Sequence, residues 1–233
     1  MNSSILQSEK QAELQKIYSV RFAGLEAYRN QVWEVLTSEF FSKWITPADS
    51  VLDLGCGYCE FINNISAGEK FAMDLNPSAR EHVASKVRLF EQDCSTTWPL
   101  RDSSLDAVFS SNFFEHLPTK ASFQATLLEA RRCLRPGGRV IAIGPNVKFL
   151  SGAYWDFFDH HLPLTEKAVS EALVMAGFEV EWAVARFLPY TMVQGFRPPI
   201  CTVRVFLKMP VIWRFFGRQF LVVARKPGSA GSL

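Results

Sequence analysis

The sequence predicts an α/β fold with a doubly wound, mostly parallel sheet. Two observations support this prediction. The short apolar run Val51–Leu54 stops at Gly55 and Gly57, as a buried parallel strand does when it turns sharply into a helix. The same scheme then recurs in Phe71–Asp74 and in Val87–Asp93, where a short apolar run is again followed by an acid. Strands that alternate with helical turns in this way are typical of a parallel sheet.

The second half of the chain continues the alternation. Apolar residues recur on one helical face of Pro118–Leu134, and the following Arg135–Gly138 is predicted to end that helix and turn into a strand. Thr165 can cap a helix that extends to Ala176. Seven strands are expected in total, and the four not yet named are Leu105–Ser110, Arg139–Ile143, Phe178–Ala185 and Gln219–Ala224.

The two ends of the chain differ from this central part. Apolar residues between Gln11 and Trp44 are spaced as in amphipathic helices that are interrupted near Gly24. The expected organisation is a helical cap over residues 1–46, one domain over 47–226 with an insertion at 186–218, and a loose tail over 227–233.

The ends of the first three expected strands carry the residue types of a nucleoside-binding edge. Gly55 and Gly57 permit positive φ and let a ligand approach the backbone. Asp74 is placed to accept hydrogen bonds from both hydroxyls of a ribose, and Asp93 could meet an adenine amine. Asp53 would orient the turn and lie near an amine of the ligand.

A nicotinamide or flavin site is the first alternative, because its phosphate-binding turn has the pattern G-x-G-x-x-G. Here Glu60 occupies the position of the third glycine, and its carboxylate would repel a pyrophosphate and crowd the helix. A ligand with an adenosine end but no phosphates fits better. S-adenosyl-L-methionine is such a ligand.

At these residues the chain resembles the class I S-adenosylmethionine-dependent methyltransferases, and the likeness extends from about Val51 to Ile143. The resemblance implies a Rossmann-like sheet whose seventh strand is antiparallel and inserted beside the sixth. One departure is Cys59, where the family often has a further glycine, so the start of the next helix is expected to shift. The segments that carry the resemblance are VLDLGCGYCEF, FAMDLNP, FEQDC, LDAVFSSNFFEHL and LRPGGRVIAIGPN.

In the resembled family, helices that precede the sheet often cover the cofactor. Arg29 is therefore a candidate partner of the cofactor carboxylate, and an exposed helix arginine without such a role is the alternative. The predicted cofactor-binding residues are Arg29, Asp53, Gly55, Cys56, Gly57, Asp74, Leu75, Asp93, Cys94, Ser111 and Asn112.

Methyl transfer from a sulfonium requires mainly that an acceptor atom be held in line and that water be excluded. His116 follows the fourth strand and could accept a proton from a hydroxyl acceptor, although a role in stabilising its loop is an alternative. The aromatic, acidic and imidazole side chains of Tyr154–His161 could form an acceptor surface or a lid. Asp159 and His160 are the secondary catalytic candidates.

No metal site is predicted, because consecutive histidines rarely converge on one ion. Five scattered cysteines argue against a disulfide framework, and Cys56 and Cys59 form a C-x-x-C without the second pair that a zinc site needs. No apolar run is long enough to span a membrane, and the polar amino terminus lacks a hydrophobic signal region, so a cytoplasmic location is expected.

Charge is distributed unevenly, because residues 1–181 carry a net −6 and residues 182–233 carry +8 with no acid. Basic and large apolar residues mix in Pro198–Gly217, which could make a peripheral contact with an anionic membrane or grip an anionic acceptor. A pocket cover or a homodimer face is the alternative. Nucleic acid is not expected as a partner, since no binding module is visible.

The sequence thus predicts a methyltransferase that acts on a small-molecule or carbohydrate-type acceptor, with transfer to oxygen. The segment DHHLPLT resembles bacterial methyltransferases of surface-polysaccharide or secondary metabolism. Two alternatives from other classes are a noncatalytic cofactor-binding partner subunit and a membrane-surface protein that acts on a lipid-linked acceptor.

Overall fold

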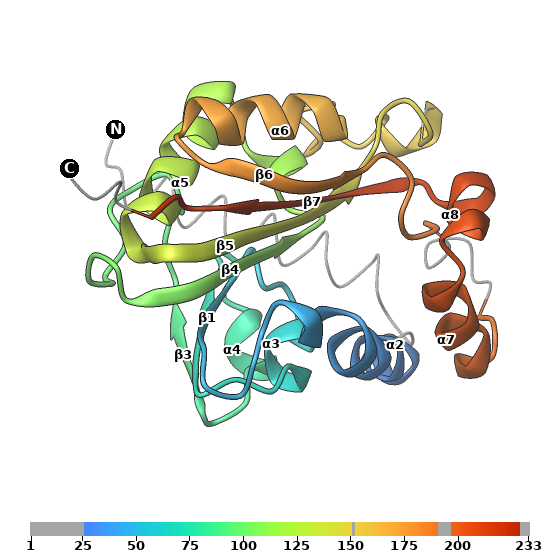
Figure 1. The fold of residues 1–233 in the computed structure, drawn as a ribbon, viewed down its shortest axis with the longest axis horizontal. Helices are drawn as coiled ribbons and strands as arrows, with labels where there is room; N and C mark the ends of the chain where they lie inside the picture. The colour runs from blue at the N-terminus through green and yellow to red at the C-terminus, as the bar shows by residue number, and fades with distance from the viewer. Residues whose placement is uncertain (1–25, 151, 191–196, 229–233) are drawn as a thin grey trace.

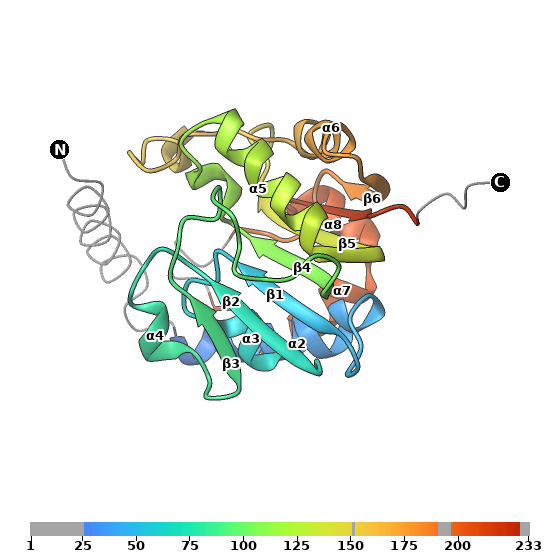
Figure 2. The ribbon, with the colours of Figure 1, turned by 90° about the vertical axis from the view of Figure 1, so that its left-hand side faces the viewer.

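A computed structural model describes residues 26–150, 152–190 and 197–228, which form one seven-stranded sheet with helices on both faces (Figures 1 and 2). The strand order is β3-β2-β1-β4-β5-β7-β6. The expected helical stretch before Glu26 and the residues of the expected tail after Gly228 lie outside the described residues. The strands are β1 Ser50–Leu54, β2 Glu69–Met73, β3 Val87–Phe90, β4 Leu105–Ser111, β5 Leu134–Pro145, β6 Glu179–Val184 and β7 Gln219–Arg225.

The direction of the strands agrees with the sequence-based prediction. Strands β1 to β5 pair in parallel, whereas β7 pairs antiparallel with β5 on one side and with β6 on the other. The α/β class, the mostly parallel sheet and the antiparallel last strand beside the sixth are therefore confirmed. The carboxyl ends of β1, β2, β3 and β4 consequently lie at one edge of the sheet, where a doubly wound fold binds its ligand.

Helices cover the two faces of the sheet, as Figures 1 and 2 show. One buried apolar cluster packs against α5 and α6, and the second packs against the face with α2 and α3. Thr119 and Thr165 cap α5 and α6 with side-chain oxygens that accept backbone N–H groups, as predicted for Thr165. The helices are α2 Glu26–Glu39, α3 Glu60–Asn64, α4 Ala79–His82, α5 Lys120–Cys133, α6 Glu166–Met175, α7 Ile200–Lys208 and α8 Pro210–Phe216, with short 3-10 turns at Phe41–Lys43, Phe114–His116 and Gly152–Tyr154.

One strand boundary was predicted wrongly. The segment Arg135–Gly138 was expected to be a turn before a strand at Arg139, but β5 already begins at Leu134, which pairs with Leu105 of β4. The register between β4 and β5 shifts after this pair. Gly137 has a φ of 84°, which permits the backbone to bend while it stays in the sheet.

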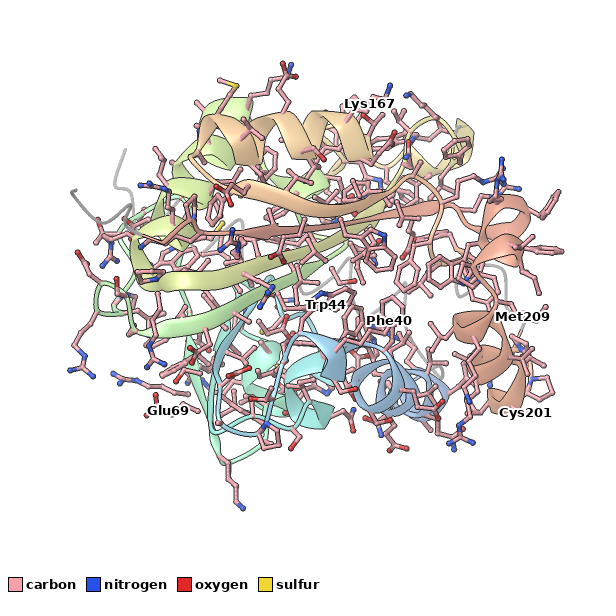
Figure 3. All side chains as sticks on the ribbon, viewed as in Figure 1. Phe40, Trp44, Glu69, Lys167, Cys201 and Met209 are labelled. Carbon is pink, nitrogen blue, oxygen red and sulfur yellow. The ribbon has the colours of Figure 1, made fainter. Side chains whose placement is uncertain are left out.

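The insertion between β6 and β7 forms α7 and α8, which lie at one end of the molecule beside α2 (Figure 1). An aromatic cluster joins this region to the sheet. Phe40, which follows α2, stacks on Phe187 with ring centroids 4.7 Å apart and meets Trp213 of α8 at 5.9 Å. Phe40 and Trp44 lie inside the molecule between α2 and the sheet, whereas Cys201 and Met209 lie at its outer end (Figure 3). The insertion is therefore packed onto the domain.

Candidate functional site

The turn after β1 is built from residues with left-handed backbone angles. Gly55 and Gly57 have φ of 70° and 51°, and the backbone N–H of Gly55 donates a 2.8 Å hydrogen bond to Met73 O of β2. A Cβ added to Gly55 would lie 2.1 Å from Cγ of Phe113, so the ring of Phe113 covers this glycine. Only glycine therefore fits at position 55.

Cys59 also adopts a left-handed angle, with a φ of 61°. It is the residue before α3, so the helix starts at Glu60, and a side chain with a Cβ there costs about 1–2 kcal/mol relative to glycine. Its Sγ lies 3.6 Å from Sγ of Cys56, and both side chains are buried free thiols. The Cys56 pKa is raised well above its ordinary value by the contact with Cys59 and by burial, which keeps that thiol protonated.

Asp74 lies directly after β2 and is buried. Its Oδ2 accepts a 2.8 Å hydrogen bond from the backbone N–H of Gly57, and its Oδ1 accepts one of 2.8 Å from the backbone N–H of Asn76. Burial raises the pKa of Asp74, and these backbone hydrogen bonds oppose the rise. Each carboxylate oxygen keeps a lone pair for a further donor.

A small cavity of about 80 Å³ opens beside Asp74 and is called the Asp74 cavity. It brings together four of the predicted cofactor-binding residues from the ends of β2 and β3, together with Phe113 and His116 from the segment after β4. The four predicted residues are Asp74, Leu75, Asp93 and Cys94. The strand ends that the sequence placed at one edge of the sheet thus do meet in space.

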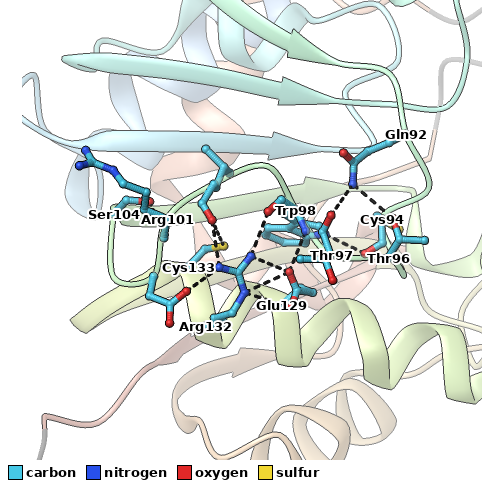
Figure 4. A network of polar contacts seen from close by, with 12 residues as sticks. Gln92, Cys94, Thr96, Thr97, Trp98, Arg101, Ser104, Glu129, Arg132 and Cys133 are labelled. Carbon is cyan, nitrogen blue, oxygen red and sulfur yellow. Dashed lines mark hydrogen bonds and ion pairs between the residues drawn. The ribbon is translucent and has the colours of Figure 1, made fainter.

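A polar network fixes the chain that follows Asp93 (Figure 4). The indole N–H of Trp98 donates to Cys94 O at 2.8 Å, and the backbone N–H of Trp98 donates to Glu129 of α5. Arg132 pairs with Glu129 at 2.7 Å and donates to the Trp98 carbonyl at 3.1 Å. This network holds the backbone of Cys94 at the wall of the Asp74 cavity.

A second cavity, of about 120 Å³, lies beside Asp53 and is called the Asp53 cavity. Burial raises the pKa of Asp53 well above its ordinary value, and the nearby charges of Asp74 and Glu60 raise it further. A cation bound beside Asp53 would instead lower the pKa of this carboxyl. The predicted residues that line the Asp53 cavity are Arg29, Asp53, Gly55, Cys56, Gly57, Ser111 and Asn112.

Arg29 lines this cavity but has a protein partner. Its guanidinium lies 2.8 Å from Oε1 of Glu60, with side chains only 12% and 11% exposed, and 5.6 Å from the ring centroid of Tyr58. The alternative of an exposed helix arginine is therefore wrong, because α2 packs its Arg29 face against α3. Whether Arg29 also meets a ligand carboxylate stays a prediction.

The three candidate catalytic residues lie together. Nδ1 of His116 is 3.2 Å from Oδ2 of Asp159 and 3.0 Å from its carbonyl, and the rings of His116 and His160 are 4.8 Å apart. Burial lowers the His116 pKa, but the hydrogen bond that the imidazole donates to Asp159 and the charges of Glu115 and Asp159 outweigh it, so the pKa is raised. A ring nitrogen of His116, a carboxylate oxygen of Asp159 and a ring nitrogen of His160 lie within 4.8 Å of one another, close enough to share a cation.

This cluster lies beside the Asp74 cavity. His116 lines that cavity together with Phe113, whose ring covers Gly55 of the turn after β1. The base role of His116, with Asp159 and His160, stays a prediction.

A third and larger cavity, of about 510 Å³, lies between α2, α7, α8 and the sheet and is called the α2–α7 cavity. Trp33, Ser111, Asn112 and Gln219 line both this cavity and the Asp53 cavity, so the two adjoin. Sequence reasoning missed Trp33, Phe113 and Gln219. Gln219 had a visible signal, since it is a polar residue that opens an otherwise apolar strand.

The residues present fit S-adenosylmethionine. Asp74 offers a buried carboxylate for two hydroxyl groups, and the turn at Gly55 and Gly57 brings bare backbone to the neighbouring cavity. Glu60 places a carboxylate at the start of α3, where a pyrophosphate would need to bind. The chemistry of the site therefore favours an adenosine ligand without phosphates.

Comparisons with known proteins agree with this geometry. Residues 52–142 match the family model described as a methyltransferase domain. The chain is 28% identical over 112 residues to the ribosomal protein L11 methyltransferase of Cupriavidus taiwanensis, which covers 47% of this chain and 36% of that protein. The chain spans between 36% and 59% of the length of the curated relatives that it matches.

Solved structures share the fold. A SAM-dependent methyltransferase from Archaeoglobus fulgidus superposes with a TM-score of 0.59 at 18% identity, covering 88% of this chain and 99% of the other. The methyltransferase in a complex with the Trm112 methyltransferase activator of Haloferax volcanii superposes with a TM-score of 0.59 at 19% sequence identity. The match covers 84% of this chain and 97% of the other. Residues 52–142 thus match a methyltransferase domain, and the described part of the chain has the fold of S-adenosylmethionine-dependent methyltransferases.

Proposed function

We propose that the protein transfers a methyl group from S-adenosylmethionine to an oxygen atom of a small-molecule acceptor. The observation that carries this proposal is the convergence of Gly57, Asp74 and Asp93. The Gly57 backbone is hydrogen-bonded to Asp74, and Asp74 and Asp93 line one cavity. Three strand ends that are separate in sequence thus form one ligand edge.

When bound, the cofactor would supply an electrophilic methyl group with a sulfide as the leaving group, and the acceptor hydroxyl would give up its proton to a base. The protein's own residues bind and orient. Asp74 accepts from ribose hydroxyls, Asp93 and the Cys94 backbone meet the adenine, and Asp53 attracts the amine. Ser111 and Asn112, between the Asp53 and α2–α7 cavities, border both ligands.

His116 is the proposed base, because Asp159 fixes its ring through the contact at Nδ1 and leaves Nε2 for a proton. Since His116 lines the Asp74 cavity and neither the Asp53 cavity nor the α2–α7 cavity, this role requires that the acceptor oxygen reach the Asp74 cavity. Its raised pKa means that the imidazole must first lose a proton as pH rises. A His116→Gln variant is expected to lower turnover with cofactor affinity kept. Unchanged turnover would end the base role.

The experiment that tests the function is a metabolite extract incubated with cofactor carrying a labelled methyl group. Wild-type protein is expected to transfer label to an extractable small molecule, and Asp74→Ala protein at the same cofactor concentration is expected to transfer far less. Label transfer that is equal in both would contradict the assignment. Label transfer to neither would favour the noncatalytic alternative.

A second candidate function is that of a methyltransferase that needs a partner subunit for turnover, which differs from the noncatalytic partner subunit that the sequence left as an alternative. It is favoured by the similarity to a methyltransferase solved together with the Trm112 activator. Affinity purification of the full chain distinguishes the two. A stoichiometric partner that is required for turnover supports the second candidate, whereas turnover by the isolated chain excludes it.

A further inference from the structure

The α2–α7 cavity has firmly attached walls. The Tyr28 hydroxyl of α2 donates a 2.8 Å hydrogen bond to Pro198 O, and Arg204 of α7 pairs with Glu39 at the end of α2 at 2.7 Å. Figure 1 shows α7 beside α2 at the end of the molecule. The cavity volume of about 510 Å³ lies within the range of small-molecule sites, about 300–1,000 Å³.

The chemistry of the wall is apolar. Among the described residues that line it, none is Asp, Glu, His, Lys or Arg. The hydroxyls of Tyr28 and Thr202 already donate to the carbonyls of Pro198 and Pro199. A sugar buried here would leave most of its hydroxyls without partners, at a cost for each one, so the wall disfavours the carbohydrate-type acceptor expected from the sequence.

Gln219 supplies a polar group at one end of this cavity. It is the first residue of β7, is only 6% exposed and lines both the α2–α7 cavity and the Asp53 cavity. Among the described residues, no partner within hydrogen-bond distance is found for its side-chain amide, and Oδ1 of Asn112, which lines the same two cavities, is buried without a hydrogen-bond partner. A buried amide in this position can bind one polar group of a ligand.

We infer that the acceptor is an uncharged, largely hydrocarbon molecule whose body fills the α2–α7 cavity and whose single polar end binds Gln219. This inference rests on the proposed function, because it takes the Asp53 cavity as the cofactor side. The polar end would then face the Asp53 cavity at the residues that the two cavities share. The hydrocarbon body would contact α7 and α8, including Phe206 and Ile212.

The first test uses the full chain and the uncharged fluorescent probe N-phenyl-1-naphthylamine. Wild-type protein is expected to bind the probe, and Ile212→Asp to weaken binding at least about 10-fold, because a carboxylate would enter an apolar wall. Val211→Asp is the matched control, since Val211 is the neighbouring β-branched residue of α8, is 69% exposed and does not line the cavity. Equal effects of the two variants would overturn the inference.

Calorimetry with S-adenosylhomocysteine on the same proteins separates this inference from the proposed function. If the protein binds the cofactor product but not the probe, the inference of an apolar acceptor is overturned and the proposed methyltransferase function stands. Probe binding that depends on Ile212, without cofactor binding, supports the apolar ligand and contradicts the methyltransferase.

The second test concerns Gln219 and compares 1-naphthol with 1-methylnaphthalene as competitors of the probe. Gln219→Met keeps an unbranched side chain of similar length but loses the amide. This variant is expected to bind 1-naphthol about 3- to 10-fold more weakly than the wild type. Its affinity for 1-methylnaphthalene is expected to stay within about twofold of the wild-type value. An equal loss for both competitors would mean that Gln219 only packs, and would overturn its assignment.

Discussion

The backbone N–H of Gly57 donates a 2.8 Å hydrogen bond to Oδ2 of Asp74, which joins the turn after β1 to the end of β2. The two residues are separated by 17 positions in the sequence. One carboxylate thus stabilises the turn and presents its remaining lone pairs to a ligand, so the turn and the predicted ribose contact depend on the same side chain.

Replacing Asp74 by alanine is expected to weaken the binding of S-adenosylhomocysteine by about one to two orders of magnitude, roughly what the loss of a charged hydrogen-bond acceptor implies. Calorimetric titration measures the affinity. Glu171→Ala is the control, because Glu171 is an exposed acid of α6 that lines none of the three cavities. A wild-type affinity in the Asp74 variant would contradict the assignment.

Gly55→Ala is expected to destabilise the fold more than Gly137→Ala. Both glycines have left-handed angles, with φ of 70° and 84°, so both variants bear a backbone cost of about 1–2 kcal/mol. At position 55 the new Cβ also meets Phe113, which adds about 1–3 kcal/mol, whereas nothing lies within 4 Å of a Cβ at position 137. Urea unfolding of the two variants measures their free energies of unfolding. Equal losses of stability would show that the Phe113 ring moves aside without cost.

Asp53→Asn is expected to stabilise the ligand-free protein and to weaken cofactor binding. A carboxyl whose pKa is raised by folding adds stability that is fully present below its ordinary value of 3.8 and is lost as pH rises through the folded pKa. Asparagine does not titrate, so the advantage of the variant grows with pH, to about 0.5–2 kcal/mol near neutrality. Unfolding measured between about pH 4 and pH 8 tests this. An advantage that is constant with pH would exclude titration of Asp53 as its cause.

Asp159→Asn is expected to lower the pKa of His116, since it removes a carboxylate whose hydrogen bond and charge help to outweigh the burial of the imidazole. The stability that this raised pKa gives the folded protein is fully present below pH 6.5, the ordinary pKa of histidine. It is lost as pH rises through the pKa of His116 in the folded state. NMR titration of the histidine ring protons measures the pKa directly. Asp156→Asn is the control, because it removes a nearby acid with no contact to His116. If both variants shift the pKa of His116 by similar amounts, the contact with Asp159 is not what raises it.

The segment 198–217 is expected to hold the protein on vesicles that contain anionic lipid. Phe215 and Val211 of α8 are 70% and 69% exposed and do not line the α2–α7 cavity, so Phe215→Ser with Val211→Ser is expected to reduce flotation. Met175→Ser on α6 is the control, since Met175 is 72% exposed on another helix. Among the described helices, none is both long and apolar enough to cross a bilayer. Flotation unaffected by the α8 changes would exclude this contact.

The arrangement of the sheet could be predicted because each of the first three strands is followed by a glycine or an acid, and these signals are local. Thr165 and Gly177, which bound α6, were visible for the same reason. The start of β5 was missed, since proline and glycines indicate a turn and only pairing with β4 shows that the backbone stays in the sheet.

The candidate site was predictable where it depends on strand ends and unpredictable where it depends on packing between distant segments. Asp74 and Asp93 meet because parallel strands end at one edge. The ion pair of Arg29 with Glu60 and the place of Gln219 between two cavities arise from contacts of α2 with α3 and of β7 with β5, which no local pattern encodes.

Since β7 runs against its neighbours, its first residue stands where the parallel strands finish. The polypeptide therefore arrives at the ligand side straight from α8, while the nucleoside edge is made entirely by residues before position 120. Described residues of the stretch 186–218 supply much of the wall of the α2–α7 cavity and none of the wall of the Asp74 cavity, so substitutions on that wall are expected to change the acceptor preference without altering the predicted ribose contact.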